Sequence, residues 1–403
     1  MKKKDILFLC QFFYPEYVSS ATLPYDTAVA LKSAGYTVDA LCGYPREYAL
    51  EQDLPKRETK DGIGIHRVSY LQLDRKGKLG RLINYFSFTF MMLLHLLEMA
   101  SYRTIIVYSN PPVLPWVASW AKKLFGCKLV FVAYDLYPEI AVRTDSMRQG
   151  SLLCRLMEHI NRAVFSRADR VVALSGEMKT YITKNRPIDS DRIVVIPNWY
   201  RDEGPCRQAG PDNRFYKTLG QSFVVSYFGN LGTVQDLDTL LGAIRILKDD
   251  DSVMFLFAGH GNKMNVLRKA VSEEALTNVT VCDFLHGQDF RDALEISGCA
   301  VISLVKGTTG LCVPSKTYSY MMEGIPLLVI MEPSDIVSDV EAGAGMRVEN
   351  GDAEGMAAAI RFMRDHPETW SRMRETCRRL YLEKYTTEIA TEQYVELMRH
   401  FMP

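Results

Sequence analysis

The chain has 403 residues, of which 47% are hydrophobic and 24% are charged, as in ordinary soluble globular proteins. Its 48 basic residues balance its 48 acidic residues, so the formal net charge is zero. This balance argues against a general attraction to nucleic acid, and any basic patch must be local. A chain of this length should form more than one domain, because domains with a single hydrophobic core rarely exceed about 250–300 residues.

The nine cysteines show no disulfide or metal pattern. None lies in a Cys-x-x-Cys pair, and most sit in or beside apolar runs. They indicate reduced core cysteines in a cytosolic protein, without a disulfide framework or a zinc site. The apolar run that follows the first few residues is too short for the core of a secretory signal. We therefore expect a cytoplasmic protein.

Short apolar runs alternate with helical patterns along the first half of the chain. We expect a helix at 21–34 and strands at 6–10, 37–42, 65–68, 104–108, 128–133, 170–174 and 193–196. Such alternation indicates βαβ units and a parallel sheet, in which ligands bind beyond the carboxyl ends of the strands. The loops after Cys10, Tyr108 and Ala133 are therefore candidate binding loops.

The loop after the first strand gathers aromatic, acidic and hydroxyl-bearing residues. It contains Tyr14, Glu16, Ser19 and Ser20 within a few positions of one another. These side chains suit the face of a sugar, because they combine a flat apolar surface with hydrogen-bonding groups. Such loops often serve only packing, and the sequence leaves both interpretations open.

The loop after 128–133 carries two carboxylates, Asp135 and Glu139. Carboxylates at a strand end could orient a hydroxyl group or stabilise positive charge that develops on a sugar ring. The alternative is structural, because aspartate often caps the first turn of a helix. The residue pattern does not decide between these two roles.

The segment 82–100 is mostly apolar, and basic residues precede it. A membrane-spanning helix needs about 20 nearly uncharged residues, and His95 and Glu98 count against one. A basic flank before an apolar helix favours a membrane-surface helix, so we expect peripheral contact through 75–100 on the inner face of the cell membrane. A helix buried between the sheet and a partner domain is the alternative. The flanking basic residues are Arg75, Lys76, Lys78 and Arg81.

A polar stretch with glycines and prolines, 201–213, separates this alternation from a second one. The second set of strands is expected at 223–228, 253–258, 279–282, 299–304 and 327–330. We therefore expect an N-terminal domain at 1–200, a C-terminal domain at 201–385, and a last helix at 386–403 that could dock back on the first domain.

Three strand ends in the second half carry glycine or lysine. Gly229, Asn230 and Gly232 follow one strand, and Gly259 follows the next. Glycine lets the backbone approach a ligand closely. A turn that packs a helix on a strand explains any one of these positions, but it explains the whole set less easily.

The third strand end leads through a loop to Lys316, in the first turn of an expected short helix. The N–H groups of a helix start lack partners and attract anions. A lysine there runs against the helix dipole, which favours an acid, and this suggests a bound anion such as a diphosphate. A solvated lysine on an ordinary crossover helix is the alternative.

Five motifs follow one another along the chain. They are Tyr14-Pro15-Glu16, Asp135-Leu136-Tyr137-Pro138-Glu139, Ile196-Pro197-Asn198-Trp199, Gly229-Asn230-Leu231-Gly232, and Pro314-Ser315-Lys316 through Gly324-Ile325-Pro326. Together these motifs resemble the family 4 glycosyltransferases, and the similarity favours the bacterial surface-polysaccharide branch that includes N-acetylfucosamine transferases.

This resemblance implies an α/β GT-B fold, with two Rossmann-like parallel-sheet domains facing across a cleft. It implies a retaining enzyme without a metal or other cofactor, in which the second domain holds a nucleotide-sugar donor, expected to be UDP-linked. The first domain would hold the acceptor, expected to be a lipid-linked or membrane-proximal glycan of surface polysaccharide biosynthesis.

The resemblance also implies roles for individual residues. Lys316 would neutralise the departing diphosphate, and Asp135 falls near the position where many relatives carry a histidine beside the transferred sugar. Residues implied for the donor are Gly229, Asn230, Gly232, Gly259, Lys306, Pro314, Ser315, Ser319 and Glu323. Residues implied for the acceptor are Tyr14, Glu16, Ser19, Ser20 and Glu139.

The chain departs from the family pattern at a pair of glutamates that many relatives place around the lysine motif. Leu311 and Ser319 stand at those positions, so it is open how the ribose would be held. Two alternatives therefore stay open. One is a nucleotide-sugar epimerase or hydrolase on the same fold, and the other is a non-catalytic scaffold protein.

Overall fold

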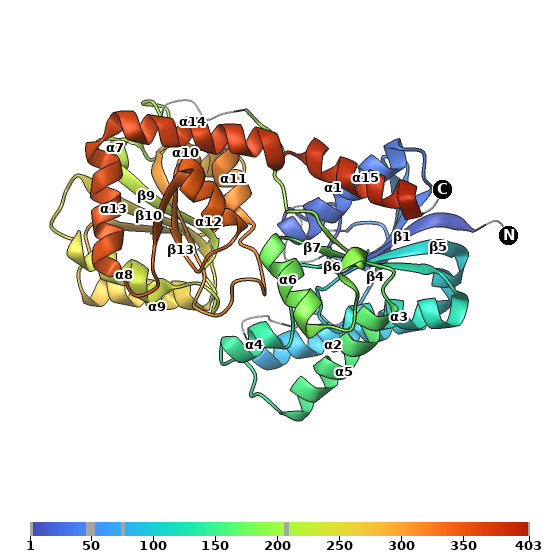
Figure 1. The fold of residues 1–403 in the computed structure, drawn as a ribbon. Coiled ribbons are helices and arrows are strands. Elements are labelled where there is room, and N and C mark those ends of the chain that lie inside the picture. The colour runs from blue at the N-terminus through green and yellow to red at the C-terminus, as the bar shows by residue number, and fades with distance from the viewer. Residues whose placement is uncertain (1–2, 46–52, 74–76, 205–208, 402–403) are drawn as a thin grey trace. The chain divides into compact units, whose positions relative to one another are not determined.

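The computed structural model describes residues 3–45, 53–73, 77–204 and 209–401 (Figure 1). Arg75 and Lys76 of the basic flank, and Cys206, lie outside these ranges. The chain divides into two compact units. The first consists of Met1–Asn198, Gly310–Val313 and Thr387–Pro403, and the second consists of Trp199–Thr309 and Pro314–Thr386.

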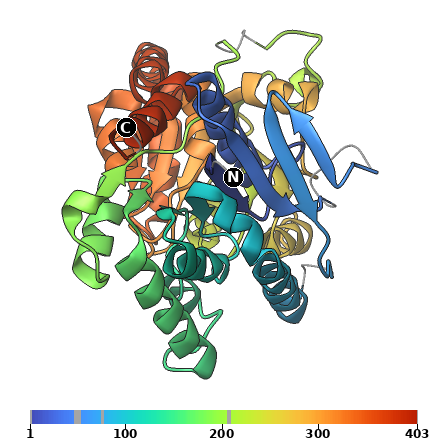
Figure 2. The same ribbon diagram turned by 90° about the vertical axis from the view of Figure 1, so that its right-hand side faces the viewer.

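The first unit is built on an eight-stranded sheet with the order β3-β4-β2-β1-β5-β6-β7-β8. All neighbouring strands are parallel except β3 and β4, which form an antiparallel hairpin at one edge of the sheet (Figure 2). The strands are β1 Lys4–Cys10, β2 Val38–Gly43, β3 Arg57–Lys60, β4 Ile63–Val68, β5 Tyr102–Tyr108, β6 Lys128–Ala133, β7 Arg170–Ala173 and β8 Ile193–Val195.

Helices cover both faces of this sheet (Figure 1). The last helix, α15, packs against α1, and α3 packs against α2 and α5. The central strands are buried on both faces because their sequences are nearly continuous apolar runs. The helices are α1 Ser19–Ser33, α2 Lys78–Leu94, α3 Leu114–Phe125, α4 Glu139–Arg143, α5 Leu152–Arg167, α6 Gly176–Asn185 and α15 Thr387–Phe401, with short 3-10 helices η1 Leu96–Ser101 and η2 Ser190–Arg192.

The apolar segment expected as one element at 82–100 forms two. Helix α2 ends at Leu94, His95 caps it, and η1 follows directly. One side of α2 is buried in the unit through residues such as Phe88 and Met92, whereas Phe90 is 59% exposed. Among the residues described, no helix is both long and apolar enough to cross a membrane.

The second unit contains a six-stranded, wholly parallel sheet with the order β11-β10-β9-β12-β13-β14. Its strands are β9 Phe223–Asn230, β10 Val253–His260, β11 Val279–Cys282, β12 Ser297–Ser303, β13 Leu327–Ile330 and β14 Gly345–Val348. Its helices are α7 Tyr216–Leu219, α8 Leu237–Ile246, α9 Asn262–Glu273, α10 Gln288–Glu295, α11 Lys316–Met322, α12 Asp335–Asp339, η3 Val340–Ala344, α13 Ala353–Asp365 and α14 Pro367–Lys384.

The core of the second unit joins the apolar faces of its strands and helices. Leu240, Ile244 and Ile360 pack with strand residues such as Phe255 in one buried cluster. Because this core holds the strands in place, it also fixes where the carboxyl end of each strand lies relative to its neighbours. The loops that follow β9, β10 and β12 therefore start from a rigid edge.

Candidate active site

The ends of β9 and β10 lie side by side in the second unit. Gly259 pairs with Gly229, and His260 pairs with Asn230. Strand pairing thus brings three of the residues expected at the donor, Gly229, Asn230 and Gly259, to the same edge of the sheet.

The backbone at this edge is too crowded for side chains at Gly259 and Gly261. A Cβ atom on Gly259 would lie 2.0 Å from the carbonyl oxygen of Gly229. A Cβ on Gly261 would lie 2.3 Å from the carbonyl oxygen of Leu231. Gly229 and Gly259 also have φ values of 100° and 146°, which L side chains rarely adopt. The close approach of the neighbouring backbone therefore requires glycine at 259 and 261.

The loop after β9 is fixed by polar contacts. The backbone N–H of Gly232 donates to Gln235 Oε1 at 2.7 Å, and Lys263 Nζ donates to the carbonyl of Gln235 at 2.5 Å. The hydroxyl of Tyr227 donates to the carbonyl of Asn230 at 2.9 Å. The loop that follows the strand is thus held in one conformation.

Lys316 is the first residue of α11, and its side chain reaches this edge. Its Cε lies 3.9 Å from the position that a Cβ on Gly229 would occupy. Its Nζ lies 3.5 Å from the centre of the Tyr227 ring. The residue as a whole is half-buried, but its Nζ atom is buried and has no hydrogen-bond partner among the described residues.

A buried ammonium group without hydrogen bonds is energetically costly. Burial lowers the pKa of the Lys316 ammonium well below its usual value. The face of the Tyr227 ring attracts a cation, but it does not replace the hydrogen bonds that water supplied. An anion placed between Lys316 and the glycine edge, meaning the ends of β9 and β10 at Gly229 and Gly259, would accept these hydrogen bonds from the ammonium group. The arrangement therefore fits an anionic ligand better than it fits a purely structural lysine.

The other donor-set residues near α11 differ in what they contact. Ser319 donates from Oγ to the carbonyl of Lys316 at 2.9 Å, so its hydroxyl is used within the helix. Pro314 is buried and accepts a 2.8 Å bond from Thr317 Oγ1. Ser315 and Lys306 are exposed. Lys306, in the loop after β12, makes no hydrogen bond or ion pair within the described part of the chain.

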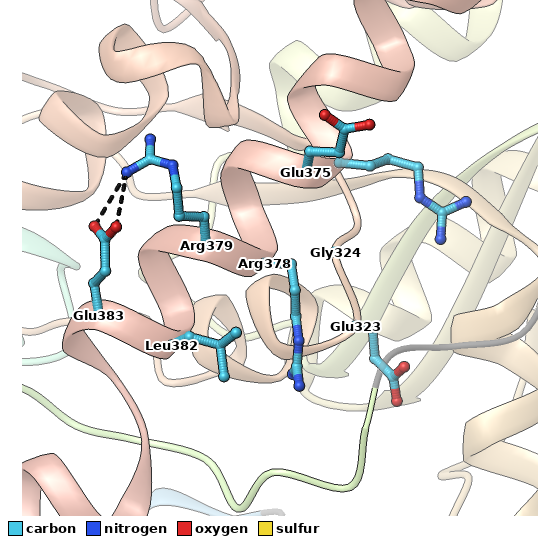
Figure 3. A pocket seen from close by; sticks show the side chains of 8 residues that line it. Glu323, Gly324, Glu375, Arg378, Arg379, Leu382 and Glu383 are labelled. Carbon is cyan, nitrogen blue, oxygen red and sulfur yellow. Dashed lines mark hydrogen bonds and ion pairs between the residues drawn. The ribbon is translucent and has the colours of Figure 1, made fainter.

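Glu323 lies at the opposite end of α11 from Lys316, where it caps the helix C-terminus. It lines an open hollow of about 630 Å³ against α14, together with Arg374 and Arg378 (Figure 3). Arg378 donates to both carboxylate oxygens of Asp202 at 2.8 Å. The structure therefore does not place Glu323 beside the Gly229–Lys316 pair.

In the first unit, Asp135 follows the end of β6. The hydroxyl of Ser109 accepts the backbone N–H groups of Tyr134 and Asp135 at 2.9 and 3.2 Å. Asp135 also forms an antiparallel bridge with Cys312. Its half-buried carboxylate makes no hydrogen bond to any described residue, and burial raises the pKa of Asp135 to about 6. The helix-cap alternative is not what the structure shows, because α4 begins after Pro138 without a side-chain cap.

The acceptor-side loop is anchored from within its own unit. The Tyr14 ring stacks on Tyr25 with centroids 5.0 Å apart, and its carbonyl accepts from Arg67 Nη2 at 2.9 Å. Arg67 is fully buried and pairs with Glu58. The loop is therefore positioned by a buried cation from β4.

The remaining acceptor-side residues occupy different environments. Glu16 is buried, and its Oε2 accepts the N–H of Phe13 at 3.4 Å. Ser19 is exposed and Ser20 is half-buried, both in the first turn of α1. Glu139 pairs with Arg186 Nη2 at 2.6 Å. Glu16 and Glu139 thus take part in holding their loops, whereas Ser19 remains open to solvent.

Sequence reasoning missed Tyr227, Ser109 and Arg67. The sequence could have indicated Tyr227, because it lies two positions before Gly229 on the same strand. Residues two positions apart on a strand lie on the same face of the sheet. Ser109 and Arg67 had none, because each acts on a residue that is distant in the sequence.

Comparison with known proteins identifies the class. A family model described as "Glycosyl transferase 4-like domain" matches residues 21–199, and one described as "Glycosyl transferases group 1" matches residues 222–365. Together the two matches cover most of the chain, with one in each unit. The chain therefore belongs to the glycosyltransferases, and its two parallel-sheet α/β units have the GT-B fold.

Two curated relatives carry glycosyltransferase names. The chain is 27% identical over 257 residues to probable glycosyltransferase WbjE of Pseudomonas aeruginosa, covering 62% of this chain and 64% of the relative. It is 19% identical over 248 residues to putative colanic acid biosynthesis glycosyl transferase WcaI of Escherichia coli (strain K12), covering 59% and 60%. The alignments span less than two thirds of either relative's length.

A solved structure supports the fold. Anabaena Alr3699/HepE in complex with UDP-glucose matches with a TM-score of 0.72 at 16% identity, over 98% of this chain and all of that chain. At this identity the match shows a common fold and no more.

Proposed function

We propose that this protein is a retaining glycosyltransferase that moves a sugar from a UDP-linked donor to a lipid-linked or membrane-proximal glycan acceptor. The observation that carries the proposal is the buried Lys316 ammonium beside the open backbone of Gly229. The UDP-glucose bound to the structural neighbour supports the donor class. The colanic acid name of one relative supports a place in surface polysaccharide biosynthesis.

The chemistry requires a group that stabilises a departing diphosphate. The bond between the anomeric carbon and the β-phosphate oxygen breaks, the acceptor oxygen bonds to that carbon, and the acceptor's proton passes to the departing diphosphate. Negative charge then gathers on the diphosphate, and preorganised cations and N–H groups stabilise it most effectively in a dry site. Lys316 supplies a buried amine without a hydrogen-bond partner among the described residues, and the glycine at 229 leaves room for a ligand to approach the backbone beside it.

The direct test is a screen of nucleotide sugars for thermal stabilisation, followed by transfer assays with the ligands that bind. A ligand at 100 times its Kd adds about 2.7 kcal/mol to stability. UDP-linked N-acetylhexosamines come first, because the motifs resemble the branch that includes N-acetylfucosamine transferases. Retention is scored from the anomeric configuration of the product. Turnover of donor without acceptor would indicate an epimerase or hydrolase, and absence of donor binding would indicate a scaffold protein.

Asp135 gives the proposal a pH dependence. If its carboxylate stabilises positive charge on the sugar ring, protonation removes that effect. Because burial raises the pKa of Asp135 to about 6, the rate should fall about tenfold per pH unit below that value and level off above it. An Asp135→Asn variant should be slow at every pH, and its rate should no longer fall at low pH. If the fall in rate at low pH persists in the variant, a group other than Asp135 causes it.

We also propose that helix α2 lies on the inner face of the cell membrane. Phe86, Phe90 and Leu94 are spaced by four residues, and Leu97 continues the row on η1. Phe90, Leu94 and Leu97 are 59, 61 and 79% exposed. An apolar row of this kind, with a basic flank before it, is typical of helices that lie in the interface.

The membrane proposal is tested by flotation with anionic liposomes. Wild-type protein should float, and a Phe90→Ser/Leu94→Ser double variant should float markedly less, since each removes exposed apolar area. The matched control is Leu124→Ser on α3, a residue that is 55% exposed outside the row. Protein that stays out of the lipid fraction at every salt concentration would contradict the proposal.

A further inference from the structure

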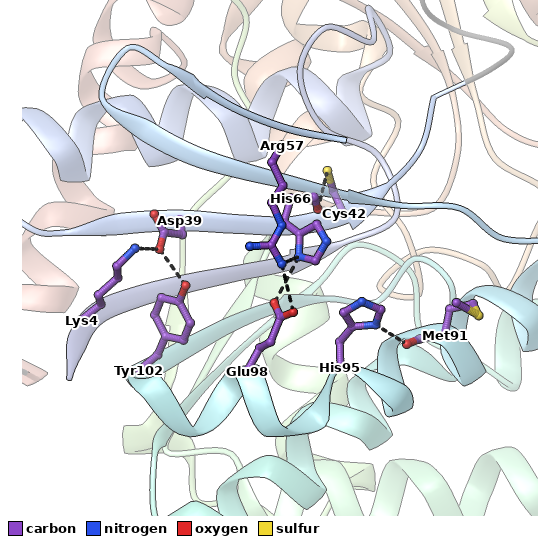
Figure 4. Close-up of polar contacts among 9 residues, drawn as sticks. All are labelled: Lys4, Asp39, Cys42, Arg57, His66, Met91, His95, Glu98 and Tyr102. Atoms are coloured by element: carbon purple, nitrogen blue, oxygen red, sulfur yellow. Dashed lines mark hydrogen bonds and ion pairs between the residues drawn. The ribbon is translucent and has the colours of Figure 1, made fainter. Parts of the chain in front are cut away.

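A second group of chemically active side chains lies in the first unit. His66 on β4, His95 at the end of α2 and Glu98 on η1 face one another (Figure 4). One potential ligand atom from each lies within 4.8 Å of the others. None of these residues has a part in the proposed sugar transfer, so the cluster needs its own explanation.

The three side chains of the cluster already lie near one another. His66 Nδ1 lies 3.1 Å from Glu98 Oε2, and the two imidazole rings have centroids 5.2 Å apart. His95 Nδ1 lies 2.9 Å from the carbonyl oxygen of Met91. A carbonyl only accepts, so Nδ1 carries a proton, and in the neutral ring Nε2 keeps its lone pair. Metal-binding histidines are commonly oriented by such a bond from the other ring nitrogen.

We infer that His66, His95 and Glu98 bind a divalent transition-metal ion, with Zn²⁺ as the best match. Two imidazoles and one carboxylate form a ligand set that Zn²⁺ accepts, with the fourth position open to water. Hard cations such as Mg²⁺ prefer oxygen ligands and fit this set poorly. None of the three residues belongs to the sets expected to bind the donor or the acceptor.

Arg57 presently supplies the positive charge at this point. Its Nη2 lies 3.4 Å from both His66 Nδ1 and Glu98 Oε1. The Arg57 side chain is 71% exposed, so it can swing into solvent when an ion enters. Arg57 and the metal therefore compete for the same carboxylate. Removing the guanidinium should favour the metal.

Binding would connect two separate parts of the first unit. His66 belongs to the sheet, whereas His95 and Glu98 follow the exposed row of α2. A bound ion would fix the end of α2 against β4. The ion would also stabilise the folded chain by mass action, because the site exists only when these segments are together.

The test is a Zn²⁺ titration of untagged, chelator-treated protein without nucleotide sugar, followed by calorimetry and by Co²⁺ absorption. Wild type should bind one equivalent. His95→Ala and Glu98→Gln should each weaken binding by about 10- to 100-fold, and Arg57→Ala should tighten it. His159→Ala, an exposed histidine on α5, is the matched control and should change nothing.

Failure of Zn²⁺ to bind, or equal binding by wild type and Glu98→Gln, would overturn the inference. The Glu98→Gln variant keeps the size of the side chain, so it remains informative if His95→Ala does not fold. Because no sugar donor is present, either outcome is scored apart from the proposed transferase activity.

Discussion

Replacing Lys316 by alanine should lower the rate of sugar transfer by about 100- to 1,000-fold, the loss expected when one group that stabilises transition-state charge is removed. The Nζ of Lys316 is buried and has no hydrogen-bond partner in the described chain. It is therefore available to a leaving diphosphate without first breaking another contact. Initial rates with saturating donor measure the effect.

The same substitution should leave the fold intact or stabilise it. Burial lowers the pKa of Lys316, so folding disfavours the ammonium. This free-energy cost of folding is fully present at pH values below the pKa of Lys316 in the folded protein. It disappears as the pH rises to about 10.4, the pKa of lysine in the unfolded chain. If the Tm of the variant is unchanged or higher while its activity is lower, Lys316 contributes to function and not to stability.

The matched control for this variant is Lys306→Ala. Lys306 is an exposed lysine in the loop that leads to α11, and it has the same formal charge. We expect a much smaller loss of rate there. Equal losses in the two variants would mean that general positive charge matters, rather than the placement of Lys316. An unchanged rate in Lys316→Ala would remove the assignment.

Replacing Gly259 by alanine should destabilise the second unit by about 2–5 kcal/mol, because it combines a steric clash with an unfavourable backbone conformation. The new Cβ would lie 2.0 Å from the carbonyl oxygen of Gly229 at a φ of 146°. Rigid backbone stands on both sides of this contact, so the strands must separate. Denaturant unfolding followed by circular dichroism measures the free energy.

Gly210→Ala is the control for this substitution. A Cβ on Gly210 would meet no atom within 4 Å, and its φ is not in the left-handed region. Its unfolding free energy should stay within about 0.5 kcal/mol of the wild type. If Gly259→Ala were equally stable, the close approach of β9 and β10 at their ends would be wrong.

Most strands could be predicted from the sequence because they are apolar runs. The exceptions lie at sheet edges. Strand β3, Arg57–Lys60, contains no apolar residue, and β14, Gly345–Val348, is short and begins with glycine. Edge strands are commonly short or charged, which prevents pairing with other chains, so their sequences carry little strand signal.

Part of the candidate site could also be predicted from the sequence, because it follows from the positions of the strands. Parallel strand ends meet at one edge of a sheet, so the sequence predicts that Gly229 and Gly259 lie together, as they do. The position of the Lys316 Nζ over the Tyr227 ring could not, because it depends on how α11 packs on β9. Glu139 illustrates the same limit, since its partner Arg186 is 47 positions away.

The measurement that tests the central claim most directly is calorimetry of nucleotide-sugar binding over a series of pH values in buffers of different ionisation enthalpy. If the donor diphosphate meets Lys316, binding raises the pKa of that group, and the wild-type protein takes up protons at pH values between its pKa in the free protein and its pKa in the complex. Lys316→Ala should bind more weakly and show no such uptake. Equal affinity and equal proton uptake in the two proteins would contradict the account.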